Sequence, residues 1–207
     1  MAEYQEHNFH SENPSHLWHY IQESLLSLIN KEDNRCILDL GCGNGYLVNN
    51  LIAYGYNAYG IDASQTGIAI AKQKNPDRFF IQDLDDSKLP VEIRDLKFDT
   101  IISTEVIEHL YNPFAFIDFC KSILDETNGE LIISTPYHGY FKNLILSVFN
   151  KWDKHTNPVA VGGHIKFWSK NTLSKLLTDA GFTIVDFKGC GRFPYLWKSM
   201  IIKAKLN

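Results

Sequence analysis

The chain has 207 residues, a length that suits one domain and leaves little room for a second. Hydrophobic residues make up 44% of the sequence and charged residues 21%, which predicts a packed core and argues against an intrinsically disordered chain. The formal net charge is −4. Nucleic acid is therefore not the expected partner, because domains that bind it tightly are as a rule basic.

Targeting and membrane-spanning segments are not expected from the sequence. No apolar run approaches the roughly 20 residues of a membrane-spanning helix, and the chain does not open with the basic and apolar regions of a signal peptide. The cysteines form no CxxC pair, which argues against a zinc ribbon or a disulfide framework; they are Cys36, Cys42, Cys120 and Cys190. We therefore expect a reducing, cytoplasmic compartment.

The expected secondary structure begins with a helix in an N-terminal helical cap, residues 1–32. Asn13 and Pro14 are a typical helix start, and apolar residues recur at helical spacing up to Leu28. Short apolar runs then predict strands at residues 36–40, 57–61, 79–81, 98–103, 130–135, 182–187 and 200–204. Helical stretches separate several of these runs: one starts near Leu47, one contains 69–71 and ends near 75–76, one runs from 112–113 towards 124, and one runs from Ser169 to Gly181.

Strands that alternate with helices are typical of a Rossmann-like, doubly wound α/β fold. We predict a mostly parallel, seven-stranded sheet with helices on both faces. No repeat or linker interrupts the sequence, so residues 1–207 are expected to form a single domain.

A glycine-rich turn follows the first predicted strand. Gly41, Gly43 and Gly45 stand where the absence of side chains lets a ligand approach the backbone. Asp62 ends the second strand, where a carboxylate can accept hydrogen bonds from both hydroxyls of a ribose. The GxGxG spacing differs from the GxGxxG that seats a dinucleotide pyrophosphate, which favours a nucleoside ligand without phosphates over NAD. The alternative is a glycine turn that only connects a strand to a helix.

Residues 37–45 resemble motif I of the class I S-adenosylmethionine-dependent methyltransferases, and residues 60–64 resemble their second motif. The resemblance extends from about Asp33 onward. It implies that the three glycines flank the methionine part and the sulfonium of the cofactor and that Asp62 holds the ribose. It also implies cofactor contacts by Asp39, Cys42, Ala63, Gln82, Asp83, Leu84 and Thr104.

Asp83 and Leu84 follow the third strand, in a segment that resembles the adenine-contacting one of this family. The resemblance implies that Asp83 accepts a hydrogen bond from the exocyclic amine, while Leu84 supplies an apolar contact. The alternative for Asp83 is a solvated loop acid beside Asp85 and Asp86.

A carboxylate–histidine cluster follows the fourth strand. In a helical turn, Glu105 would share one face with Glu108 and His109, at i, i+3 and i, i+4 spacing. Two carboxylates this close repel one another unless a proton or a cation intervenes, and carboxylates with an imidazole suit Mg²⁺, Mn²⁺, Fe²⁺ or Zn²⁺. His164 follows Gly162 and Gly163, which let the backbone bring it close to a ligand.

The ExxEH element and the distal histidine resemble two methyltransferase groups, the ubiquinone-biosynthesis O-methyltransferases and the small-RNA 2′-O-methyltransferases. The second resemblance implies a divalent cation held by Glu105, Glu108, His109 and His164. Such a cation would lower the pKa of an acceptor hydroxyl. Without a metal, His109 or His164 can act as general base, since a neutral imidazole takes a hydroxyl proton near neutral pH. The alternative is a solvated helix face with a locally packed histidine. Glu105, His109 and His164 are thus the candidate catalytic residues.

Residues 137–162 form a variable lid segment. An apolar, roughly helical series spans residues 137–152, with interspersed lysines. It predicts either a cap helix packed on the domain over the active site or an amphipathic lid that touches a membrane surface or an apolar substrate. A second aromatic loop lies at residues 191–198.

The favoured function is an S-adenosylmethionine-dependent O-methyltransferase. Its acceptor is expected to be a small hydroxylated molecule, a catechol- or quinol-like ring or a sugar, and Mg²⁺ or another divalent cation would assist. A peripheral membrane contact is a further expectation for the protein. The rivals are an RNA ribose 2′-O-methyltransferase and a catalytically silent cofactor-binding module.

Overall fold

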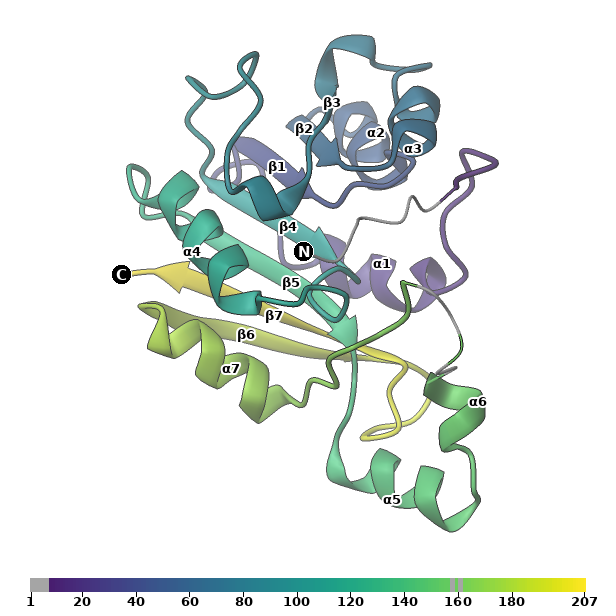
Figure 1. The fold of residues 1–207 in the computed structure, drawn as a ribbon. Coiled ribbons are helices and arrows are strands. Elements are labelled where there is room, and N and C mark those ends of the chain that lie inside the picture. Colours follow the sequence, from purple (N-terminus) through teal and green to yellow (C-terminus); the bar gives the residue numbers. More distant parts are fainter. Residues whose placement is uncertain (1–7, 157–158, 160–161) are drawn as a thin grey trace.

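A single twisted sheet organises the computed structural model, which describes residues 8–156, 159 and 162–207. Its strand order is β3-β2-β1-β4-β5-β7-β6 (Figure 1). The strands are β1 (Cys36–Leu40), β2 (Asn57–Asp62), β3 (Phe79–Ile81), β4 (Thr100–Thr104), β5 (Glu130–Pro136), β6 (Phe182–Cys190) and β7 (Ser199–Leu206). Strands β1 to β5 pair in parallel, whereas β7 pairs antiparallel with both β5 and β6. The predicted seven-stranded, mostly parallel α/β fold is confirmed.

Helices cover both faces of the sheet. They are α1 (Trp18–Leu26), α2 (Tyr46–Ala53), α3 (Gln65–Ala71), α4 (Pro113–Leu124), α5 (Tyr140–Val148), α6 (Trp152–Thr156) and α7 (Lys170–Asp179). Because successive strand residues point to opposite faces, Leu38 packs with α4 and α7 while its neighbour Ile37 packs with α1, α2 and α3. Figure 1 shows α5 and α6 standing beyond the carboxyl end of β5.

Two helix starts follow the predicted capping residues. The Asn112 side chain accepts from the Ala115 amide at the start of α4, and Pro113 occupies the first turn. Ser169 and Thr172 form a reciprocal capping box at the start of α7.

The predicted start of the first helix is wrong. The sequence predicts a start at Asn13, but α1 begins at Trp18. The Asn44 side-chain amide donates to the carbonyls of Ser11 and Asn13, both at 2.8 Å, and so holds this segment on the glycine turn instead of in a helix. The predicted N-terminal helical cap, residues 1–32, lies partly outside the described residues, as does the 137–162 lid segment.

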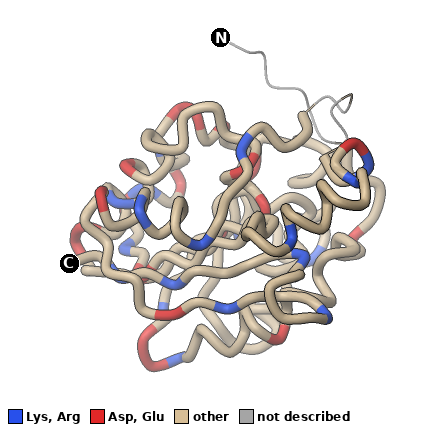
Figure 2. Tube along the Cα trace, turned by 90° about the horizontal axis from the view of Figure 1, so that it is seen from below, with Lys and Arg blue, Asp and Glu red and all other residues tan. Residues whose placement is uncertain are grey.

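Charges of both signs are interspersed along the described chain, as Figure 2 shows. None of the helices in residues 8–156 and 162–207 is both long and apolar enough to cross a membrane.

Candidate active site

The glycine turn joins β1 to α2 at the carboxyl edge of the sheet. Gly41, Gly43 and Gly45 all have positive φ, at 82°, 54° and 72°, a region that other residues rarely adopt. The amides of Gly41 and Cys42 both donate to the Ile61 carbonyl at the end of β2, at 2.9 and 3.0 Å. The turn is therefore fixed by backbone conformation and by β2 together.

Asp62 is held against this turn by two backbone amides. Its Oδ2 accepts from the Gly43 amide at 2.7 Å, and its Oδ1 accepts from the Ser64 amide at 2.7 Å. Ser64 in turn caps α3 by accepting from the Gly67 amide. The predicted ribose-binding acid and the predicted glycine turn are thus brought together as one unit.

Asp39 and Cys42 are buried behind the turn. Burial, with a smaller effect of Asp62, raises the pKa of Asp39 to about 8, and burial raises the pKa of Cys42 well above its usual value. Oδ1 of Asp39 has no hydrogen-bond partner among the described residues. A buried acceptor beside a glycine cradle fits a ligand that carries amino and hydroxyl donors.

The remaining predicted cofactor residues lie around Asp62. Ala63 follows Asp62 directly, and the Gln82 amide donates to the Asp62 carbonyl at 3.0 Å. Asp83 accepts from the Asp85 amide at 3.0 Å and so caps a short 3-10 turn, Leu84–Asp86. Leu84 packs against the core, and Thr104 ends β4. Adenine recognition by Asp83 and Leu84 stays a prediction.

Phe9 is a contact that the sequence did not indicate. A Cβ on Gly43 would lie 2.7 Å from its ring, and one on Gly67 would lie 2.9 Å away. The Phe9 amide donates to Thr66 Oγ1 at 3.1 Å. The N-terminal segment therefore lies against the glycine turn, a long-range contact that no local sequence pattern signals.

The loop after β4 is not the predicted helical turn, which corrects the expected shared face of Glu105, Glu108 and His109. Glu105 has a left-handed φ of 55°, and its amide still donates to the Ser134 carbonyl of β5, at 3.1 Å. Pairing with β5 thus continues beyond the last residue of β4 and gives Glu105 a backbone conformation that is not helical. A turn formed by residues 107–109 follows.

Glu105 is bound by hydroxyl groups of two other strands. Ser134 and Ser199 donate to its Oε1 at 2.8 and 2.6 Å. Burial raises its pKa, and the two hydroxyls and the Lys142 charge oppose that shift. Glu105 is therefore not part of the group formed by Glu108 and the two histidines. Instead, its hydrogen bonds connect the end of β4 to β5 and β7.

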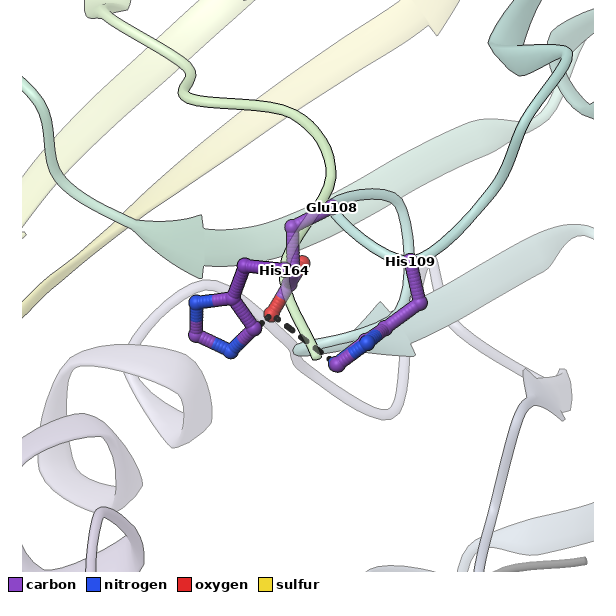
Figure 3. Close-up of side chains that lie close together, drawn as sticks. All are labelled: Glu108, His109 and His164. Atoms are coloured by element: carbon purple, nitrogen blue, oxygen red, sulfur yellow. Dashed lines mark ion pairs between the residues drawn. The ribbon is translucent and has the colours of Figure 1, made fainter. Parts of the chain in front are cut away.

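Glu108, His109 and His164 do come together, from the loop after β4 and the loop before α7 (Figure 3). One ligand atom from each lies within 4.8 Å of the others. Oε1 of Glu108 lies 3.9 Å from Nε2 of His109 and 4.0 Å from Nε2 of His164. This Oε1 is buried without a hydrogen-bond partner in the described chain, whereas Thr135 Oγ1 donates to Oε2 at 2.9 Å.

Backbone contacts bring the distal histidine to this place. The Glu108 carbonyl accepts from the amides of Ile165 and Lys166, at 2.9 and 3.0 Å. Nδ1 of His109 lies 2.8 Å from the Gly162 carbonyl, which fixes the tautomer with the proton on Nδ1. In that tautomer Nε2, which faces Glu108, is the atom that can bind a metal or accept a proton.

Electrostatics favour the neutral form of His164. Burial, then His109 and Lys142, lowers the pKa of His164. Burial and the Glu105 charge raise the pKa of Glu108. A buried carboxylate oxygen that faces two imidazoles is a donor set suited to Mn²⁺, Fe²⁺ or Zn²⁺.

The segment after β5 is helical, and Tyr137 at its start is buried, but most apolar side chains of α5 and of the residue that ends it are exposed. The exposed side chains are Tyr140, Phe141, Leu144, Ile145, Val148 and Phe149. Lys142 is the buried residue of α5. The Phe141 ring lies 6.1 Å from Tyr195 of the second aromatic loop, which links the two segments. The expectation of a cap helix with a buried apolar face is wrong for α5.

The comparisons with known proteins agree with this architecture. The sequence profile of a methyltransferase-domain family matches residues 10–186. A ubiquinone biosynthesis O-methyltransferase of Rickettsia canadensis is 32% identical, over 87% of this chain and 75% of that protein. One of Cereibacter sphaeroides is 26% identical, over 78% of this chain and 65% of that protein.

A solved structure shows the same fold. The magnesium protoporphyrin IX methyltransferase of Synechocystis with bound SAH aligns at a TM-score of 0.67 and 22% identity, covering 89% of this chain and 81% of that one. The glycine turn, the acid after β2 and the mostly parallel sheet define an S-adenosylmethionine-dependent methyltransferase. The chain belongs to the methyltransferase-domain family.

Proposed function

We propose that this methyltransferase transfers the methyl group of S-adenosylmethionine to a hydroxyl oxygen of a small catechol- or quinol-like acceptor. The observation that carries the proposal is the Glu108–His109–His164 cluster. Glu108 and His109 stand on the loop after β4, which also packs on the glycine turn through Val106. A Cβ on Gly41 would lie 2.4 Å from Cγ2 of Val106, so the two sites share one wall. The relatives named for ubiquinone biosynthesis support a ring acceptor.

The glycine turn and its acids would hold the cofactor. The backbone of Gly41, Gly43 and Gly45 would lie along its methionine part, and Asp62 would accept from the ribose hydroxyls. Asp39 offers the buried acceptor atom that lacks a partner within the described chain. Predicted contacts also come from Cys42, Ala63, Gln82, Asp83, Leu84 and Thr104. When bound, S-adenosylmethionine supplies a methyl group already activated on a sulfonium, so the protein's task is alignment and exclusion of water.

Glu108, His109 and His164 would hold a divalent cation. Such an ion lowers the pKa of a bound hydroxyl and so presents the acceptor oxygen in its reactive form. Glu105 lies outside this donor set, and the hydrogen bonds from Ser134 and Ser199 support a positioning role for it. The rival is a metal-free site in which His109 or His164 removes the hydroxyl proton.

A peripheral membrane contact through residues 137–152 belongs to the same proposal. The exposed Phe141 of α5 lies 6.1 Å, between ring centroids, from the exposed Tyr195, and Lys151 follows the helix. Apolar side chains with flanking lysines are typical of segments that lie in a membrane interface. Such a contact would bring the site to an acceptor dissolved in the bilayer.

The test is transfer of radiolabelled methyl from S-adenosylmethionine to catechol, with calorimetry of S-adenosylhomocysteine binding alongside. We expect turnover that EDTA abolishes and Mn²⁺ or Mg²⁺ restores, with unchanged affinity for S-adenosylhomocysteine. Full turnover in EDTA would refute the metal proposal and favour the histidine base. Transfer to short RNA, with binding that weakens steeply with salt, would favour the ribose methyltransferase instead. Cofactor binding without transfer to any acceptor would identify a silent module.

A further inference from the structure

Helix α5 exposes apolar side chains and buries a lysine, which is the opposite of the usual pattern of a surface helix. Its apolar residues are exposed, Tyr140 at 75% and Val148 at 68%, while Lys142 is 8% exposed. The Lys142 amino group is buried and has no hydrogen-bond partner among the described residues, where it also makes no ion pair. A buried ammonium without a partner is costly, since it loses its hydration and receives no compensating contact.

The charged and titratable groups that act on Lys142 come from several elements. Burial, then Lys198, lowers its pKa to about 8, and the Glu105 charge opposes that shift. Burial and the Lys142 charge lower the pKa values of His138 and His155 to about 4, which leaves both neutral at physiological pH. Glu105 is the one acid with a resolved effect on Lys142, and its Oε1 is engaged by two hydroxyls. The Oε2 atom of Glu105 is also buried without a hydrogen-bond partner in the described chain, but it forms no ion pair with the Lys142 amino group. Among the described residues, therefore, no carboxylate contacts this amino group directly.

Lys142 lies on the acceptor side of the site. Its helix follows His138, whose amide donates to the Trp168 carbonyl at 2.9 Å and so ties this segment to the loop that carries His164. The Lys142 charge also lowers the pKa of His164. Lys142 thus lies on the side of the loop that carries His164, near the place where the acceptor hydroxyl would be presented.

We propose that Lys142 binds a carboxylate of the methyl acceptor, so that the enzyme prefers hydroxylated rings that also carry an acidic group. The inference rests on the proposed O-methyl transfer and narrows its substrate class. An anionic group on the acceptor would supply the contact that the buried amine lacks, through a charge-assisted hydrogen bond. The methionyl carboxylate of the cofactor has the same chemistry and is the competing source.

The experiment compares 3,4-dihydroxybenzoate with its neutral methyl ester as acceptors. The proteins are wild type, Lys142→Met, and Lys154→Met as a matched control, because Lys154 is an exposed lysine of the same 137–162 segment. We expect wild type to prefer the acid. Lys142→Met should lower kcat/KM for the acid by about 10- to 100-fold, mainly through KM, with the ester changed by less than about threefold. Lys154→Met should retain the wild-type preference.

Three results would overturn the inference. The first is a wild-type enzyme that does not prefer the acid. The second is an equal loss for acid and ester in a Lys142→Met protein whose thermal unfolding matches wild type, which would make Lys142 structural. The third is a loss of S-adenosylhomocysteine affinity by the same factor, which would assign the amine to the cofactor.

Binding of both rings to the enzyme–S-adenosylhomocysteine complex separates this inference from the function on which it rests. Absence of methyl transfer to every acceptor would refute the proposed function. Calorimetry then decides the inference alone: tighter binding of the acid than the ester, lost in Lys142→Met, supports the carboxylate contact. Equal binding, or binding of neither ring, refutes it.

Discussion

Thr135→Val offers a direct test of the metal site through a residue that does not itself bind the ion. Thr135 Oγ1 donates to Oε2 of Glu108 at 2.9 Å, and Val has nearly the same shape without the donor. Residues that orient a metal ligand typically affect metal affinity by 10- to 100-fold, which corresponds to about 1.4–2.8 kcal/mol. We therefore expect Thr135→Val to weaken divalent-cation binding by such a factor and to retain the fold.

The assay is methyl transfer to catechol as a function of free Mn²⁺ concentration, with Mn²⁺ binding measured by calorimetry. Excess Mn²⁺ should restore most of the Thr135→Val turnover. Ser134→Ala is the matched control, because Ser134 donates to Glu105 and not to Glu108. It should destabilise the protein by about 1–3 kcal/mol through the hydrogen bond that the buried Glu105 loses, yet leave Mn²⁺ affinity within about threefold of wild type. Equal effects of the two substitutions on Mn²⁺ affinity would refute the assignment of Glu108 and Glu105 to different roles.

Three further predictions concern the cofactor acid, the buried aspartate and the lid. Asp62→Ala should weaken S-adenosylhomocysteine binding by about 1–3 kcal/mol in calorimetry, since charge-assisted hydrogen bonds are lost; unchanged affinity would contradict the ribose assignment. The pKa of Asp39 is raised to about 8 in the folded protein, so the folded state binds the extra proton and stability should fall as pH rises from about 4 to 8. Asp39→Asn should flatten that dependence in urea unfolding, and an unaltered slope would count against a raised pKa. Replacing Phe141 and Phe149 together with serine should reduce co-sedimentation with anionic vesicles while catechol turnover persists; retained vesicle binding would exclude α5 as the contact.

The sheet, the glycine turn and the acid at the end of β2 were predictable from local sequence patterns. The sequence predicts a buried strand at residues 36–40, and the structure has β1 there. A short apolar run between polar segments is typical of a strand that is covered on both faces of a parallel sheet. Gly41, Gly43 and Gly45 predict a turn after the first strand, and the structure has that turn with positive φ at all three, because steric limits at each residue act locally. The capping residues Asn112 and Ser169 are likewise confirmed, since a helix start depends on neighbours within one turn.

The tertiary structure alone decided which side chains of the second half meet. Glu105 leaves the predicted helical face because its amide and carboxylate bind β5 and β7, strands that lie 29 and 94 residues away in sequence. Lys142 turns inward and the aromatic side chains of α5 outward, the reverse of what hydrophobic periodicity predicts for a surface helix. Periodicity describes the faces of a helix but not which face meets the domain, because that choice depends on the charges and hydroxyls that distant strands bring to the same edge of the sheet.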